Sequence, residues 1–217
     1  MIEESYYEGF EIDESNPKTS WSQIIHLAGT GHRILDIGCW IGKLAEKLKS
    51  NGNTVVGVEI NPQWAKRAGE HCNVTLCGDV EDEEFWRSVP DAYDVIILGD
   101  ILEHLYDPWN LLKRLHEKLN PNGYVLCSIP NVANWRPRLE LMLGSFTYKP
   151  TGIIFYHHLR FFTRASAEAM FLEAGFKMEY FGVTCYRLPL FLAKLFPTLF
   201  AIQFVYKLLP NNTSING

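Results

Sequence analysis

The sequence predicts an α/β protein with a doubly wound, mostly parallel sheet of seven strands and helices on both faces. Three observations favour this fold. Short apolar runs typical of buried strands alternate along the chain with segments of helical pattern. Two helical segments begin with a capping residue followed by proline, at Asn61-Pro62 and Asp107-Pro108. A glycine-bracketed turn, Gly38 to Gly42, directly follows the first apolar run, and such strand-turn-helix units build parallel sheets.

The first two thirds of the chain contain five of the predicted strands. A helix over Lys43–Lys49 follows the first strand and ends at Asn51-Gly52. The helix that begins at Pro108 is predicted to reach Leu119, and Asn122-Gly123 is predicted to turn the chain into the fifth strand. The five strands are predicted at Arg33–Ile37, Thr54–Val58, Val74–Cys77, Asp94–Leu98 and Tyr124–Ile129.

The last third is less regular. Thr163 is predicted to cap a helix over Ala165–Glu173, and Phe176–Thr184 is predicted to form the sixth strand. A short helix over Leu188–Phe196 is predicted to end at the following proline. Ala201–Leu208 is rich in β-branched and aromatic residues, which favours a final, antiparallel strand.

The 217 residues are predicted to form a single domain, because this length with 47% hydrophobic content suits one buried core. Residues 1–30 are predicted to form an N-terminal helix or lid. Within them, Tyr6, Tyr7 and Trp21 either cover a ligand or anchor the segment on the sheet. Residues 131–162 interrupt the rhythm of strands and helices, and this insertion is predicted to cover an acceptor molecule.

Composition limits the partners and the compartment. The net charge is −5 and no run of Lys or Arg occurs, which argues against a nucleic-acid partner. A small molecule or a protein is the expected partner. No basic segment followed by an apolar stretch opens the chain, which predicts no export. The cysteines form no C-x-x-C pair and are odd in number, which predicts reduced thiols and a cytoplasmic location. The five are Cys39, Cys72, Cys77, Cys127 and Cys185.

The apolar stretch from Pro189 to Leu209 has two interpretations. It is long enough for a membrane span, but it contains Lys194, Pro197, Gln203 and Lys207, and a spanning helix would have to bury or snorkel the charges. A core helix followed by a strand is the favoured interpretation, so no transmembrane segment is predicted. Weak contact with a membrane surface or a dimer interface stays open, with the chain a monomer or a homodimer.

The first two strand ends predict an adenosine-containing cofactor. Glycines let the turn after the first strand approach a ligand closely, and Glu59 ends the second strand, where a carboxylate can accept hydrogen bonds from two ribose hydroxyls. A dinucleotide would need G-x-G-x-x-G, whereas this turn carries Trp40 between Gly38 and Gly42. Asp36 would repel a phosphate but attract a cationic amino group.

Asp36, Gly38 and Gly42 resemble the D-x-G-x-G-x-G motif of class I S-adenosylmethionine-dependent methyltransferases, with Trp40 in place of a glycine. The chain resembles the type 11/12/23-like members. This resemblance implies a Rossmann-like methyltransferase fold, S-adenosylmethionine as cofactor and S-adenosylhomocysteine as product. It also implies that the carboxylate of Asp79 meets the adenine amino group. The implied cofactor residues are Asp36, Gly38, Cys39, Trp40, Gly42, Glu59, Ile60, Gly78, Asp79, Val80, Gly99 and Asp100.

Further matches concern the acceptor. The run Leu98–Leu105 resembles the corresponding segment of ubiquinone-biosynthesis O-methyltransferases. Ser128–Val132, His158–Thr163 and Glu173–Phe176 resemble a branch associated with cell-surface sugar pathways. The resemblance therefore implies O-methylation of a small-molecule acceptor such as a sugar, a glycan precursor or a quinone-like compound.

A base is needed if the acceptor is an alcohol, because a sulfonium already carries an activated methyl group. The candidate bases are His104, His157 and His158, with His158 favoured and His104 second, and Asp100 is a further candidate catalytic residue. Each histidine could instead have a purely structural role.

Asp100, Glu103 and His104 would share one face if their loop coiled, and they could then hold a divalent metal ion. Their D-x-x-E-H pattern resembles the E-x-x-E-H of quinone O-methyltransferases. The favoured prediction is nevertheless that the chain has no metal ligands, since these side chains could equally cap a helix or contact the cofactor.

The sequence also bears on three other functions. An amine methyltransferase acting on bases should carry Asn/Asp-Pro-Pro-aromatic after the fourth strand, where this chain has Gly99-Asp100-Ile101-Leu102. A nicotinamide-dependent oxidoreductase would explain Glu59 but not Trp40. A catalytically weak, cofactor-binding regulatory module stays open, because Trp40 departs from the motif.

Overall fold

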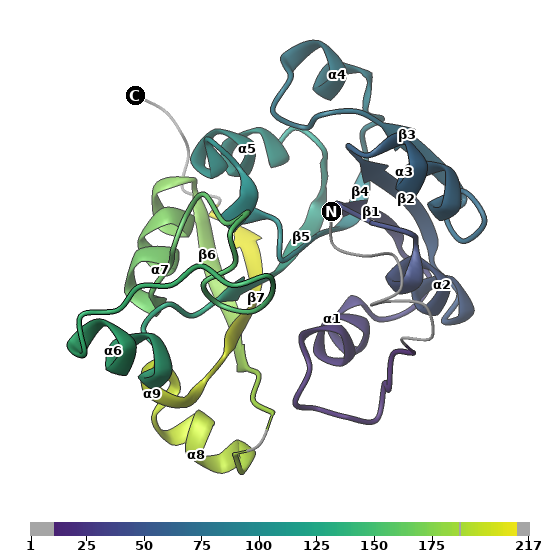
Figure 1. Cartoon of the computed structure of the whole chain (residues 1–217). Coiled ribbons are helices and arrows are strands. Elements are labelled where there is room, and N and C mark those ends of the chain that lie inside the picture. Colours follow the sequence, from purple (N-terminus) through teal and green to yellow (C-terminus); the bar gives the residue numbers. More distant parts are fainter. Residues whose placement is uncertain (1–10, 187, 212–217) are drawn as a thin grey trace.

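The computed structural model describes residues 11–186 and 188–211 of the chain (Figure 1). Seven strands form one sheet in the order β3-β2-β1-β4-β5-β7-β6. Neighbouring strands from β1 to β5 pair in parallel, whereas β7 is antiparallel to both β5 and β6. The predicted doubly wound, mostly parallel sheet is therefore confirmed, including its antiparallel final strand. The strands are β1 (Arg33–Ile37), β2 (Thr54–Glu59), β3 (Val74–Cys77), β4 (Tyr93–Gly99), β5 (Leu119–Pro130), β6 (Phe176–Val183) and β7 (Gln203–Pro210).

Side-chain caps start most of the helices. The Asn61, Asp107 and Thr163 side chains accept hydrogen bonds from backbone N–H groups of the first helical turn, as predicted. The helices are α1 (Ser20–Ala28), α2 (Lys43–Ser50), α3 (Pro62–Ala68), α4 (Glu83–Ser88), α5 (Pro108–Leu115), α6 (Trp135–Met142), α7 (Arg164–Glu173), α8 (Leu190–Leu195) and α9 (Pro197–Phe200), with a 3₁₀ turn, η2, over Leu102–His104.

Helices cover both faces of the sheet. Successive side chains of β1 point to opposite faces, so Leu35 and Ile37 join one buried cluster while Ile34 joins another. The first cluster includes buried side chains of α4, α5 and α7, and the second includes those of α1, α2 and α3. Burying the apolar surface of both sheet faces is the main source of stability for such a fold.

Two predicted boundaries around β5 are wrong. The α5 helix ends at Leu115, and Leu119 begins β5 instead of closing the helix. Asn122-Gly123 lies inside β5, where the pairing with β4 shifts register. A β-carbon at Gly123 would lie 2.8 Å from the carbonyl oxygen of Tyr93. The glycine thus allows two backbones to approach within a strand irregularity, which the sequence alone presented as a turn.

The chain ends differ partly from expectation. Residues 1–10 with Tyr6 and Tyr7 lie outside the described residues, whereas Trp21 on α1 packs against the core layer that holds α1 and α2. Pro197 begins α9 and does not simply end a helix. The stretch from 189 to 209 divides into α8, α9 and β7, in agreement with the predicted helix and strand. Among the described residues, no helix has the length and hydropathy required to span a bilayer.

Candidate functional site

The order of the strands places the candidate functional residues at one edge of the sheet. The carboxyl ends of β1 to β4 lie together because these strands are parallel. The chain passes from β1 outward to β2 and β3, and β4 then lies on the other side of β1. Ligands bind at such a reversal of strand order in open α/β sheets. The tips of β1, β2 and β3 thus form one half of the site, and those of β4 and β5 form the other.

The turn after β1 has a left-handed backbone at three positions. Gly38, Trp40 and Gly42 have φ angles of 73°, 48° and 82°. The φ of Gly38 favours glycine, and a β-carbon there would lie 2.0 Å from the side chain of Ile101, which would have to move. Trp40 adopts a conformation that glycine takes without steric cost, which for other residues costs about 1–2 kcal/mol. The departure from the motif therefore changes the side chain while the turn keeps a glycine-like path.

Glu59 holds this turn in place. Its Oε2 accepts a hydrogen bond from the Trp40 backbone N–H at 3.0 Å, and its Oε1 accepts one from the Asn61 N–H at 2.9 Å. Burial raises the pKa of the Glu59 carboxyl, and the backbone hydrogen bonds oppose that shift. Each carboxylate oxygen keeps a second lone pair, so Glu59 can still accept hydrogen bonds from a ligand.

Asp36 is a buried carboxyl with an open acceptor. Its Oδ2 has no hydrogen-bond partner among the residues that the structure describes. Burial raises the pKa of Asp36 well above its usual range, and the nearby Cys72 and Glu59 add to the shift. A buried acceptor without a partner is costly, and a cationic group would relieve that cost. This unpaired oxygen therefore fits the ammonium group of an amino-acid ligand.

The β3 tip offers a second carboxylate and an apolar surface. Asp79 is exposed, and its Oδ1 accepts a hydrogen bond from the Glu81 N–H at 2.8 Å. A β-carbon at Gly78 would lie 2.2 Å from the ring of Phe85, so a larger residue there would displace that ring. Ile60, at the neighbouring β2 tip, is 63% exposed. An exposed aliphatic side chain beside an acceptor suits a flat, amine-bearing ring.

The side chains of two other expected cofactor residues are buried. Cys39 is buried in the cluster that contains α1 and α2, and its thiol lies beside Gly57 of β2. Val80 is buried in the cluster that contains α4 and α5. Their side chains pack the turns that carry the exposed groups.

Asp100 belongs to a network that the spacing did not predict. It follows Gly99 at the β4 tip with a φ of 55°. Its carboxylate accepts hydrogen bonds from the Ser128 hydroxyl at 2.9 Å and from the Gln203 amide at 2.7 and 2.8 Å. Burial raises the pKa of Asp100, and these hydrogen bonds oppose the rise. Asp100 thus joins β4 to β5 and β7.

Glu103, His104 and His158 form the second constellation, hereafter the His-Glu cluster. One ligand atom from each lies within 4.8 Å of the others. The rings of His104 and His158 meet edge to face with centroids 4.8 Å apart, and His158 Nε2 lies 3.9 Å from Glu103 Oε1. The structure thus groups Glu103 and His104 with His158 from the 131–162 insertion, whereas the sequence grouped them with Asp100.

Backbone carbonyls orient both imidazoles. His104 Nδ1–H donates to the carbonyl of His157 at 3.2 Å, and His158 Nδ1–H donates to that of Ile153 at 3.0 Å. A carbonyl only accepts, so each Nε2 keeps its lone pair. Burial lowers the pKa of His104, and burial followed by the charge of His104 lowers the pKa of His158 to about 4. Both imidazoles are therefore neutral acceptors near neutral pH.

Glu103 lies beneath these rings. It is 1% exposed, and neither carboxyl oxygen has a hydrogen-bond partner within the described parts of the chain. Burial, and then the nearby Asp100, raises its pKa well above the usual range. Its backbone carbonyl accepts the N–H groups of Leu159 and Arg160, which fastens the insertion to η2.

The cluster can act on a proton or hold a metal ion. Two neutral Nε2 atoms can accept the proton of a hydroxyl that enters between them. Two imidazoles and one carboxylate also form a ligand set suited to zinc or another first-row divalent ion. The unpaired Glu103 oxygens fit either a donor group or a cation.

Sequence reasoning missed Ser128 and Gln203 as site residues. Gln203 is a polar residue at the start of β7, just before the apolar Phe204 and Val205, and this position is the only local indication in the sequence. The partnership of His158 with Glu103 joins residues 55 positions apart and has no sequence pattern.

A family model described as a methyltransferase domain matches residues 14–180. The chain is 32% identical over 152 residues to the ubiquinone biosynthesis O-methyltransferase of Aeromonas salmonicida (strain A449), covering 67% of this chain and 63% of that protein. It is also 32% identical over 155 residues to the mitochondrial ubiquinone biosynthesis O-methyltransferase of Schizosaccharomyces pombe, covering 66% of this chain and 54% of that protein. The chain thus spans less than two thirds of the length of these curated relatives.

Solved structures support the fold. The magnesium protoporphyrin IX methyltransferase from Synechocystis PCC 6803 with bound SAH matches with a TM-score of 0.66 at 14% identity, covering 95% of this chain and 92% of that chain. A SAM-dependent methyltransferase from Archaeoglobus fulgidus matches with a TM-score of 0.64 at 19% identity, covering 94% of this chain and 98% of that chain.

Proposed function

The chain belongs to the S-adenosylmethionine-dependent methyltransferases, and from this premise we propose that it transfers the methyl group of that cofactor to an oxygen atom of a small-molecule acceptor. The observation that carries the proposal is the pair of buried carboxyls at adjacent strand ends. Asp36 has an unpaired oxygen, and Glu59 keeps free lone pairs beside the glycine-bracketed turn.

The β1 to β3 tips are the proposed cofactor half. Glu59 accepts the ribose hydroxyls, Asp36 attracts the amino group, and Asp79 with Ile60 meets the adenine. The bound cofactor supplies a methyl group already activated by its positive sulfur. The protein then has to orient the acceptor oxygen, exclude water and manage one proton.

The His-Glu cluster is the proposed acceptor half. We propose His104 as the base, because it is half-buried whereas His158 is buried behind it. With cofactor bound, His104 Nε2 would take the hydroxyl proton while the acceptor oxygen forms its bond to the methyl carbon and the methyl–sulfur bond breaks, which leaves S-adenosylhomocysteine. His158 and Glu103 orient the hydroxyl and His104. This reverses the order of the two histidines favoured from sequence, because burial limits access to His158.

The acceptor is proposed to be a ring bearing a hydroxyl group, such as a sugar, a glycan precursor or a quinone-like compound. The ring of Phe161 is half-buried, lies 6.3 Å from that of His158 between centroids, and can pack against such a ring. The names of the curated relatives favour O-methylation. A panel of these acceptors with labelled cofactor tests the proposal. Cofactor binding without methyl transfer to any of them would favour a regulatory module instead.

The pH dependence of turnover follows from the lowered histidine pKa values. The base must be neutral, and a pKa below the ordinary value of 6.5 keeps it neutral to lower pH. Turnover should therefore be lost only as the pH falls through the lowered value, so the acid limb of the rate profile should lie below pH 6.5. An acid limb at or above an ordinary histidine pKa would contradict the proposed role of His104.

Removing a metal ion should affect the acceptor half of the site and leave cofactor binding unchanged. Glu103, His104 and His158 are the residues that would hold a divalent ion, which would lower the pKa of a bound hydroxyl. We expect dialysis against a chelator to leave cofactor affinity unchanged, because the proposed cofactor residues lie on other strand tips. Calorimetric titration before and after dialysis measures this. Weaker cofactor binding after dialysis would contradict the division of the site.

A further inference from the structure

Helices α6, α8 and α9 lie together at one end of the molecule (Figure 1). Side-chain amides fasten the start of α6 to the end of α9. Asn131 donates to the carbonyls of Thr198 and Ala201, and Asn134 donates to that of Ala201. Both asparagines are buried. The start of α6 and the end of α9 thus form one supported unit, whose outer surface we call the α6–α8 surface.

Large apolar side chains are exposed across the α6–α8 surface. Every residue from 141 to 152 is exposed. Met142 and Leu143 are 83% and 76% exposed, and Phe191 and Leu195 on α8 are each 65% exposed. Isolated exposed apolar residues are ordinary, but a group of this size marks an interaction surface. Its apolar members are Trp135, Leu139, Leu141, Met142, Leu143, Phe146, Tyr148, Phe191, Leu195 and Phe196.

Cations gather on the same surface. The chain has a net charge of −5, yet segments 135–149 and 189–200 contain four Lys or Arg residues and one carboxylate, Glu140. Glu140 pairs with Lys149. Within the described residues, no carboxylate forms an ion pair with Arg136, Arg138 or Lys194. The α6–α8 surface is therefore both apolar and locally positive.

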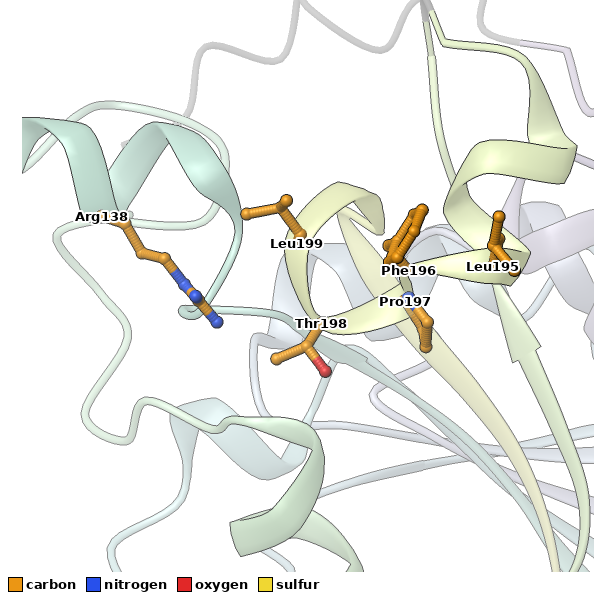
Figure 2. A pocket seen from close by; sticks show the side chains of 6 residues that line it. All are labelled: Arg138, Leu195, Phe196, Pro197, Thr198 and Leu199. Carbon is orange, nitrogen blue, oxygen red and sulfur yellow. The ribbon is translucent and has the colours of Figure 1, made fainter.

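A shallow cleft of about 330 Å³ lies within this surface. Figure 2 shows Arg138 on one side of Thr198, with Leu195, Phe196 and Pro197 on the other. A cation beside apolar side chains can bind a phosphate group while the apolar side chains contact the hydrocarbon attached to it. The cleft lies between α6 and the α8–α9 pair, apart from the strand tips that form the candidate site.

We propose that the α6–α8 surface docks on an anionic lipid bilayer. Apolar side chains enter the boundary between headgroups and acyl chains, and cations meet lipid phosphates. Trp135 and Tyr148 suit the headgroup level. A second copy of this chain fits poorly, because a twofold interface would bring the same cations together. A protein partner would need a groove for the protruding Met142 and Leu143, whereas a fluid bilayer adapts to them.

This inference goes beyond methyl transfer and requires neither cofactor nor acceptor. The test is flotation of the whole chain with vesicles of phosphatidylcholine alone or with about one third phosphatidylglycerol. We expect flotation with the anionic vesicles, little with phosphatidylcholine alone, and loss at high salt. Absence of flotation with the anionic vesicles would overturn the proposal and leave a protein partner as the occupant.

Variants identify the surface. Met142→Asp with Leu143→Asp should lower vesicle binding at least about tenfold, since each buried methylene contributes to insertion. Arg136→Gln and Lys194→Gln should each lower it about fivefold. Leu172→Asp on α7, where Leu172 is 55% exposed, and Lys113→Gln on α5 are matched controls that should bind as the unaltered chain does. Unchanged binding of the double Asp variant would overturn the proposal. So would a dimer, seen by light scattering, that this variant dissociates.

Discussion

The substitution Glu59→Ala is expected to weaken S-adenosylmethionine binding by about 1.5–3 kcal/mol, the cost of losing hydrogen bonds to a charged acceptor. This corresponds to about a ten- to hundredfold rise in the dissociation constant measured by calorimetry. Part of the loss is indirect. Removing the carboxylate leaves the backbone N–H groups of Trp40 and Asn61 without their acceptor, so the turn that approaches the cofactor loosens.

A second variant separates the two contributions. Glu59→Gln keeps the side-chain length and one acceptor oxygen, so it should preserve more of the thermal stability of the cofactor-free chain than Glu59→Ala does. Both variants lose the charge that strengthens ribose hydrogen bonds. If Glu59→Ala bound the cofactor with unchanged affinity, the ribose would be held elsewhere.

Turnover should fall by about 10²- to 10⁴-fold in His104→Ala, the range for removing a general base, while cofactor affinity stays intact. The imidazole lies among the acceptor-half residues and makes no contact with the β1 to β3 tips in the described hydrogen bonds. Steady-state rates with a verified acceptor and calorimetry with the cofactor measure the two quantities. His26→Ala, at an exposed position on α1, is a matched control without expected effect.

The same measurements on His158→Ala test the sequence-based preference for that residue. A positioning role predicts reduced turnover and an altered acid limb, because His158 contacts the His104 ring. If both His104→Ala and His158→Ala retained full turnover, the cluster would have no part in proton transfer.

Local patterns were sufficient for much of the fold. The bounds of β1 and β3 agree with prediction, and Asn61, Asp107 and Thr163 cap helices as expected. Buried parallel strands form apolar runs, and capping depends on residues within one turn. Such elements depend on few distant contacts.

The features that the sequence did not predict depend on tertiary contacts. The α6 helix was not predicted, because most of its apolar residues face outward and only Asn134 and Pro137 at its start are buried. The α4 helix was also missed. It spans six residues and is anchored chiefly by the buried Trp86, which gives no helical repeat. The register shift inside β5 arises from pairing with β4.

The candidate site likewise combines features that local patterns predict with features that depend on tertiary contacts. The glycine turn and the strand-end acids are local features, and they were found. The D-x-x-E-H spacing assumed one helical face, but Asp100 has a left-handed backbone and only Leu102–His104 coil, as a 3₁₀ turn. Asp100 therefore turns toward Ser128 and Gln203, and His158 takes its place beside Glu103.

The decisive measurement is a crystal structure of the chain with S-adenosylhomocysteine. We expect the ribose hydroxyls on the Glu59 carboxylate, the amino group beside Asp36, and the sulfur facing Glu103, His104 and His158. A nucleoside bound away from the tips of β1 to β3, or a sulfur directed away from those three residues, would contradict this expectation.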